Sequence, residues 1–139
     1  MGPSTVRDAM TSAPTTVGAD ESAVDAARLM ASENVGSLPV VEGGELVGII
    51  TDRDLVLHVL AKDLDPHKVV VATVCTDSPV VVGPEDSLDI ALQRMAREQV
   101  RRLPVVEDRR LVGMLAQADV SRNAAPAATG RLVEEISEN

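Results

Sequence analysis

Two short segments of the chain carry side chains that suit the binding of a polar ligand. Thr51 and Asp54 stand three residues apart at the expected start of a helix, which is the spacing of a capping box. The same place also suits a ligand, because N–H groups at a helix start favour an anion and a carboxylate can hold a pair of sugar hydroxyls. Asp119 occupies the corresponding position later in the chain. The spacing alone supports a structural cap and a binding site equally.

The residues that usually act in catalysis are few and lie apart. His58 and His67 are the only histidines, and neither stands at a motif spacing from a serine or cysteine nucleophile. The single cysteine, Cys75, excludes an internal disulfide and a multi-cysteine metal site and fits a reducing cytosol, and we expect it to fill an apolar niche. No P-loop, dinucleotide-binding or zinc-protease motif is present. The sequence therefore predicts a cytoplasmic protein that is not an enzyme and has no metal site.

The composition disfavours nucleic acids and membranes as partners. The chain carries 13 basic and 22 acidic residues, a net charge of −9, and it has no Phe, Tyr or Trp on which bases could stack. No apolar run approaches the roughly 18 residues of a membrane span, and residues 1–13 lack the layout of a signal peptide. We expect a soluble module of 139 residues with a core of aliphatic side chains and methionine.

Basic residues are concentrated in one stretch of this acidic chain. Residues 94–110 contain six arginines against three acidic residues. They are Arg94, Arg97, Arg101, Arg102, Arg109 and Arg110. A solvated helix face with a hairpin tip explains most of these arginines as well as an anion-binding site does.

The chain is an internal duplication, and this feature sets its expected architecture. Residues 6–55 align with residues 71–120 at a constant offset of 65 without a gap, and 20 of the 50 aligned pairs are identical. The identities include turn residues as well as apolar positions, so one backbone design has been kept twice. We expect the two copies to pack about a pseudo-twofold axis and to create two related clefts.

Each copy predicts the order strand, helix, strand, strand, helix. In the first copy the strands are expected at 15–17, 38–41 and 46–51, with a helix from about Asp20 and another over 52–62. The second copy has strands at 80–82, 103–106 and 111–115 and a helix from about Glu85. The helix from about Asp20 is expected to bury Val24, Ala27 and Met30. The helix from about Glu85 is expected to bury Leu88, Leu92 and Met95.

The predicted domain organisation follows the duplication. The first repeat with its N-terminal segment covers 1–62, a linker covers 63–70, and the second repeat covers 71–122. A tail over 123–139 remains, in which Leu132, Val133 and Ile136 suit a short helix.

The duplicated pattern resembles a tandem CBS domain pair, the regulatory module named after cystathionine beta-synthase. The resemblance is carried by the methionine-containing helix, by Leu-Pro-Val-Val-Glu at 38–42 and 103–107, and by the segments that end in Asp54 and Asp119. It covers residues 6–120. It implies an α+β fold of two β-α-β-β-α repeats in one compact module. It also implies a stand-alone regulatory role, clefts that bind AMP, ADP, ATP or S-adenosylmethionine as regulatory ligands, and homodimers.

Carried over to this chain, the resemblance implies a set of ligand-binding residues. The two aspartates would bind ribose, the threonine of the first copy ribose or phosphate, and the residues just before Leu-Pro-Val-Val phosphate. The strand at 15–17 would lie beside the adenine. The implied residues are Asp119, Arg101, Arg102, Thr16, Thr51, Asp54, Ser37 and Val17.

The second copy departs from the family pattern at Ala116, where the first copy has Thr51. Alanine removes both the cap and the hydroxyl contact, so we expect two unequal clefts. The cleft with Asp119 has arginines for a phosphate, whereas the cleft with Thr51 has acidic neighbours. The missing hydroxyl also supports an alternative, in which the module binds no nucleotide and acts only through dimerisation or contact with an unidentified regulated protein.

Overall fold

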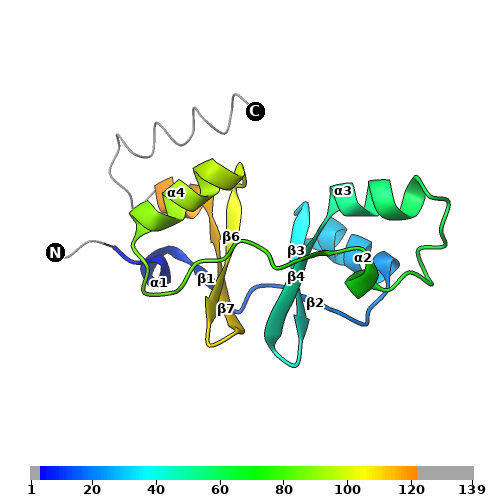
Figure 1. Cartoon of the computed structure of the whole chain (residues 1–139), viewed down its shortest axis with the longest axis horizontal. Coiled ribbons are helices and arrows are strands. Elements are labelled where there is room, and N and C mark those ends of the chain that lie inside the picture. The colour runs from blue at the N-terminus through cyan, green and yellow to red at the C-terminus, as the bar shows by residue number, and fades with distance from the viewer. Residues whose placement is uncertain (1–3, 122–139) are drawn as a thin grey trace. The chain divides into compact units, whose positions relative to one another are not determined.

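A computed structural model describes residues 4–121, and these residues form two units that each enclose an apolar core (Figure 1). Residues 15–79 form one of them, which we call the continuous unit. Residues 4–14 and 80–121 belong together in the other, which we call the split unit.

The continuous unit combines a small sheet with two main helical segments. Its strands are β2 (Val17–Gly18), β3 (Ser37–Glu42), β4 (Glu45–Thr51) and β5 (Thr76–Asp77). Its helices are α2 (Ala23–Glu33), α3 (Asp52–Leu55), the π-helical turn η1 (Val56–Leu60) and the 3-10 turn η2 (Val71–Thr73). β2 runs parallel to β3, whereas β3 and β5 both run antiparallel to β4.

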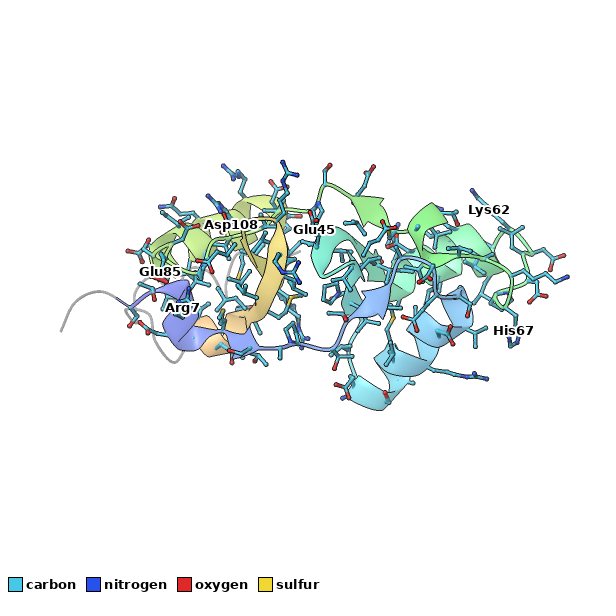
Figure 2. All side chains as sticks on the ribbon, turned by 90° about the horizontal axis from the view of Figure 1, so that it is seen from below. Arg7, Glu45, Lys62, His67, Glu85 and Asp108 are labelled. Atoms are coloured by element: carbon cyan, nitrogen blue, oxygen red, sulfur yellow. The ribbon has the colours of Figure 1, made fainter. Side chains whose placement is uncertain are left out.

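The split unit repeats this design with segments from both ends of the described chain. It contains α1 (Val6–Ala9), β1 (Thr11–Ser12), α4 (Leu88–Glu98), β6 (Arg102–Glu107), β7 (Arg110–Ala116) and α5 (Gln117–Ser121). β1 and β6 pair antiparallel with β7, and Val82 forms a parallel bridge with Val105. Figure 1 shows α1 and β1 next to β7. Arg7 of α1 also forms an exposed ion pair (2.7 Å) with Glu85, which precedes α4, and Figure 2 labels both residues.

The two units exchange the opening segments of the two repeats. Val6 of the first repeat is buried in the core of the split unit, and its N–H donates to Asp86 O (2.9 Å). Its counterpart Val71 is buried in the core of the continuous unit and donates to Glu21 O (2.8 Å). Residues 4–14 therefore pack with the second repeat, and residues 71–79 pack with the first. The expected division of the sequence into repeats at 1–62 and 71–122 stays a prediction.

The hairpins are confirmed, whereas the helix starts need correction. α2 and α4 begin three residues later than expected, at Ala23 and Leu88 rather than at Asp20 and Glu85. The reason is that Ser22 and Ser87 are the N-caps, and their hydroxyls accept hydrogen bonds from the backbone three residues ahead.

The helix faces follow from these starts. α4 buries Leu88, Leu92 and Met95 as predicted. α2 buries Ala23, Ala26 and Met30 instead of the predicted stripe that included Val24 and Ala27.

The remaining expected strands and helices are shorter or divided in the structure. The strands expected at 15–17 and 80–82 are shorter, because only Val17 and Val82 of these segments pair with a neighbouring strand. The helix expected over 52–62 is divided between α3 and η1. The predicted tail over 123–139 lies outside the described residues. Within residues 4–121, no helix is long and apolar enough to cross a membrane.

Candidate ligand-binding sites at the sheet ends

The strand directions bring most of the predicted residues of the continuous unit to one end of its sheet. Because β3 and β4 are antiparallel, the start of β3 lies beside the last residue of β4, and Ser37 pairs with Thr51. α3 starts at this same end and carries Asp54. Thr16 directly precedes β2, whose first residue Val17 pairs with Val40, so Thr16 lies further along the sheet than Ser37 and Thr51.

Thr51 and Asp54 form a reciprocal capping box, which confirms the structural interpretation of their spacing. The Thr51 N–H donates to Asp54 Oδ2 (2.9 Å), and the Asp54 N–H donates to Thr51 Oγ1 (3.0 Å). The other carboxylate oxygen, Oδ1, lies 3.9 Å from His58 Nε2. The hydroxyl hydrogen of Thr51 and the Oδ1 atom of Asp54 are the groups that this arrangement leaves for a polar ligand.

Asp52 makes this site unfavourable for an anion. Its N–H donates to Gly36 O (2.9 Å), which joins the start of α3 to the residue before β3. Its carboxylate lies against Gly36, where an added Cβ would be 3.0 Å from Oδ2. A phosphate placed beside Ser37 would therefore meet an exposed carboxylate.

The split unit repeats the same backbone arrangement with different side chains. Arg102 pairs with Ala116 across the ladder, and the Gln117 N–H donates to Arg101 O (2.7 Å). Asp119 Oδ2 accepts a hydrogen bond from the Ala116 N–H (3.3 Å). Half of the capping box therefore persists, while the reciprocal bond is lost because alanine has no hydroxyl.

Arg101 and Arg102 supply the cations of this second site. Both side chains are exposed, and within the described chain neither guanidinium makes a hydrogen bond or an ion pair. Other arginines of the basic stretch are engaged, since Arg94 donates to Val81 O (2.7 Å) and Arg97 lies 3.6 Å from Glu98. Arg101 and Arg102 are therefore available to bind an anion, whereas Arg94 and Arg97 of α4 already have partners.

Two residues of the continuous unit depart from the expected arrangement. The Val17 side chain is completely buried in the core, so only its backbone could contact a ligand. His58 lies beside Asp54, although it was not among the predicted binding residues. Its spacing of four residues from Asp54 on a helix was the signal that could have found it.

Cys75 fills an apolar niche of the continuous unit, as expected. It packs against the core that includes Met30 and Ile50. Partial burial, and next the negative charges of Asp54 and Asp77, raise the pKa of the Cys75 thiol, so it stays protonated at neutral pH.

The chain matches known proteins over most of its length. The CBS domain family matches residues 6–61 and 71–125. Hypoxic response protein 1 of Mycobacterium tuberculosis is 36% identical over 133 residues, which span 95% of this chain and 93% of that protein. The crystal structure of hypoxic response protein I with two coordinated zinc ions has a TM-score of 0.80 at 35% identity and covers 88% of this chain and 100% of its own.

Two further structures contain adenosyl ligands. The crystal structure of CBSX2 in complex with AMP has a TM-score of 0.74 at 34% identity and covers 85% of this chain and 93% of its own. The CBS domain pair of protein MJ0100, in complex with methylthioadenosine and S-adenosylmethionine, has a TM-score of 0.74 at 29% identity, with coverage of 87% and 95%. With both repeats matched and the α+β tandem-pair fold shared, this chain belongs to the CBS domain family.

Proposed function

We propose that this chain is a regulatory module without catalytic activity that binds an adenine nucleotide at the Asp119 site of the split unit. The observation that carries the proposal is the pair of exposed arginines, Arg101 and Arg102, which no other group in residues 4–121 engages. AMP in the CBSX2 structure shows that a CBS pair of similar sequence accepts such a ligand. The module requires no cofactor, and we place it in the cytoplasm, where it would act on a separate regulated protein.

The residues of the site would divide the ligand between them. Arg101 and Arg102 would hold phosphate oxygens, and each charge-assisted hydrogen bond contributes about 1.5 to 3 kcal/mol. Asp119 would accept hydrogen bonds from the ribose hydroxyls. S-adenosylmethionine carries a positive sulfonium and no phosphate, so the arginines favour AMP, ADP and ATP over it.

Calorimetric titration with AMP, ADP, ATP and S-adenosylmethionine tests this proposal. The nucleotides should bind the unmodified chain, and Arg102→Gln should weaken their binding about tenfold because one charged contact is lost. Arg109→Gln is the matched control, since Arg109 is exposed in the turn between β6 and β7, at the other end of this hairpin from Arg102. Flat traces for all four ligands would refute nucleotide binding.

A second candidate function, action through a homodimer, is favoured by exposed apolar side chains on η1. Val56, Leu57 and Leu60 are 51%, 40% and 64% exposed. An apolar groove of about 330 Å³ runs between α2 and this segment, lined by residues such as Ala27 and Leu60. Such a patch in a water-soluble chain is typical of a surface that a partner covers. We propose that the partner is a second copy of the chain.

The dimer is tested by light scattering coupled to size exclusion. The unmodified chain should elute with the mass of two copies, and Leu60→Glu should give one copy because a carboxylate would be buried in the contact. Ile90→Glu, at an exposed apolar residue of α4 in the split unit, is the control. A monomeric unmodified chain would rule out this second function and leave nucleotide binding untouched.

A further inference from the structure

The continuous unit carries a pocket that the sheet-end residues do not line. Its volume is about 640 Å³, which is within the range of small-molecule sites. Its walls come from the end of η1, from the turn that follows, and from η2 with the residues around it. Polar and apolar side chains both line it, among them His58, Lys62, Lys68, Leu64, Val70 and Cys75.

The charge of this pocket is opposite to that of its unit. Residues 15–79 contain 11 acidic and four basic residues, yet two of these four bases line the pocket. They are Lys62 and Lys68, the only lysines of the chain, and one of its two histidines, His58, is added to them. Neither ammonium group forms an ion pair with a carboxylate of the described residues. Figure 2 labels Lys62 on the segment that follows η1.

The segment that supplies His58 and Lys62 has an unusual backbone. His58 lies in η1, four residues after Asp54, and Lys62 lies in the turn that follows η1. Within this segment the Ala61 N–H donates to Val56 O (2.8 Å) and the Leu64 N–H to Val59 O (3.0 Å), both across five residues. π-Helical turns of this kind occur frequently at functional sites.

The apolar lining of the pocket is also exposed. Leu64 and Val70 are 46% and 39% accessible to solvent. The one hydroxyl in the wall, that of Thr73, already donates to Val70 O (2.6 Å) and is not available as a donor to a ligand. The donors that remain are the two lysines and the imidazole, and beside them lies an apolar surface.

We infer that this pocket binds a small organic anion with an apolar body. Lys62 and Lys68 hold the anionic group, with His58 as a further hydrogen-bond donor, and the body lies against Leu64 and Val70. This inference goes beyond the proposed nucleotide site, which belongs to the other unit, and stands without it.

The probe for this pocket is 8-anilinonaphthalene-1-sulfonate, an aromatic sulfonate whose fluorescence rises on binding. The chain has no Trp or Tyr, so protein fluorescence does not interfere. The sulfonate should bind one site, and the double variant Lys62→Gln, Lys68→Gln should weaken it at least about tenfold. Arg53→Gln, which removes an exposed cation of α3 outside the pocket, should leave the affinity unchanged.

Two further arms separate this site from general apolar adsorption. N-phenyl-1-naphthylamine has the same rings without the sulfonate, and its fluorescence should not respond to the lysine variants. Cys75 lines the pocket, so saturating sulfonate should slow its alkylation by N-ethylmaleimide in the native protein. No sulfonate binding, equal binding to the double lysine variant, or an unchanged alkylation rate would overturn the inference.

Discussion

At the scale of single residues, the difference between the two repeats is concentrated at Thr51 and Ala116. The two positions correspond in sequence and in strand register, since Ser37 pairs with the first and Arg102 with the second. Threonine completes a capping box with Asp54, whereas alanine has no hydroxyl that could accept a hydrogen bond from the Asp119 N–H. The repeat that lacks the threonine of the cap is also the one that carries Arg101 and Arg102.

Replacing each of these two residues by its counterpart, in separate variants, should change the free energy of unfolding in opposite directions. Ala116→Thr should raise the free energy of unfolding by about 1 kcal/mol, because it restores the hydrogen bond from the Asp119 N–H, and Thr51→Ala should lower it by a similar amount. Urea titration followed by circular dichroism at 222 nm measures both variants. If Ala116→Thr destabilised the chain, the proposed equivalence of the two turns would be wrong.

At the scale of elements, both hairpins depend on a glycine that a neighbouring strand approaches closely. Gly48 of β4 pairs with Asp77 of β5, and a Cβ there would lie 2.7 Å from Thr76 O. Gly113 of β7 is the corresponding residue, and a Cβ there would lie 2.5 Å from Met10 Sδ and 3.0 Å from Thr11 O. A backbone oxygen cannot move without breaking the pairing, but at Gly113 it lies further away than at Gly48, and the methionine side chain can rotate.

The alanine variants of these glycines should therefore differ. Gly48→Ala should lower the free energy of unfolding by about 1 to 3 kcal/mol through overpacking, and Gly113→Ala should cost less. Thermal unfolding followed by circular dichroism compares them. A larger loss in Gly113→Ala would mean that the Met10 side chain is held more rigidly than the strand β5.

The elements that could be predicted from sequence are those with local signals. Apolar, β-rich runs on both sides of a turn predicted β3, β4, β6 and β7, because the residues of a hairpin themselves specify it. The helix starts were placed too early, because Asp20 and Glu85 have the acidic character of a first turn while the serines that follow are the actual caps. The pocket at Lys62 was not predicted, because its residues are spread from 58 to 75 without a motif.

At the scale of the whole molecule, the exchange of opening segments could not be predicted from the duplication. The repeat shows that Val6 and Val71 are equivalent, but it does not show which core each one enters. The hydrogen bonds from Val6 to Asp86 and from Val71 to Glu21 link residues that are 80 and 50 positions apart, so no local pattern reveals them. Each unit therefore depends on residues from both repeats.

Truncating these valines should affect the unit that each one enters. Val6→Ala should lower stability by about 1 to 3 kcal/mol and accelerate hydrogen exchange in β6 and β7, while Val71→Ala should accelerate it in β3 and β4. Hydrogen exchange read by mass spectrometry distinguishes the segments. Faster exchange in β3 and β4 of Val6→Ala would show that the first repeat keeps its own opening segment.

The proposed nucleotide site lies at the sheet end of the split unit that carries Asp119, Arg101 and Arg102, and calorimetric titration of AMP into two aspartate variants tests it most directly. Asp119→Ala should weaken AMP binding more than Asp54→Ala does. Neither variant should unfold the chain, because each removes at most a cap of about 1 kcal/mol. A greater loss of affinity in Asp54→Ala would contradict the claim and place the nucleotide in the continuous unit.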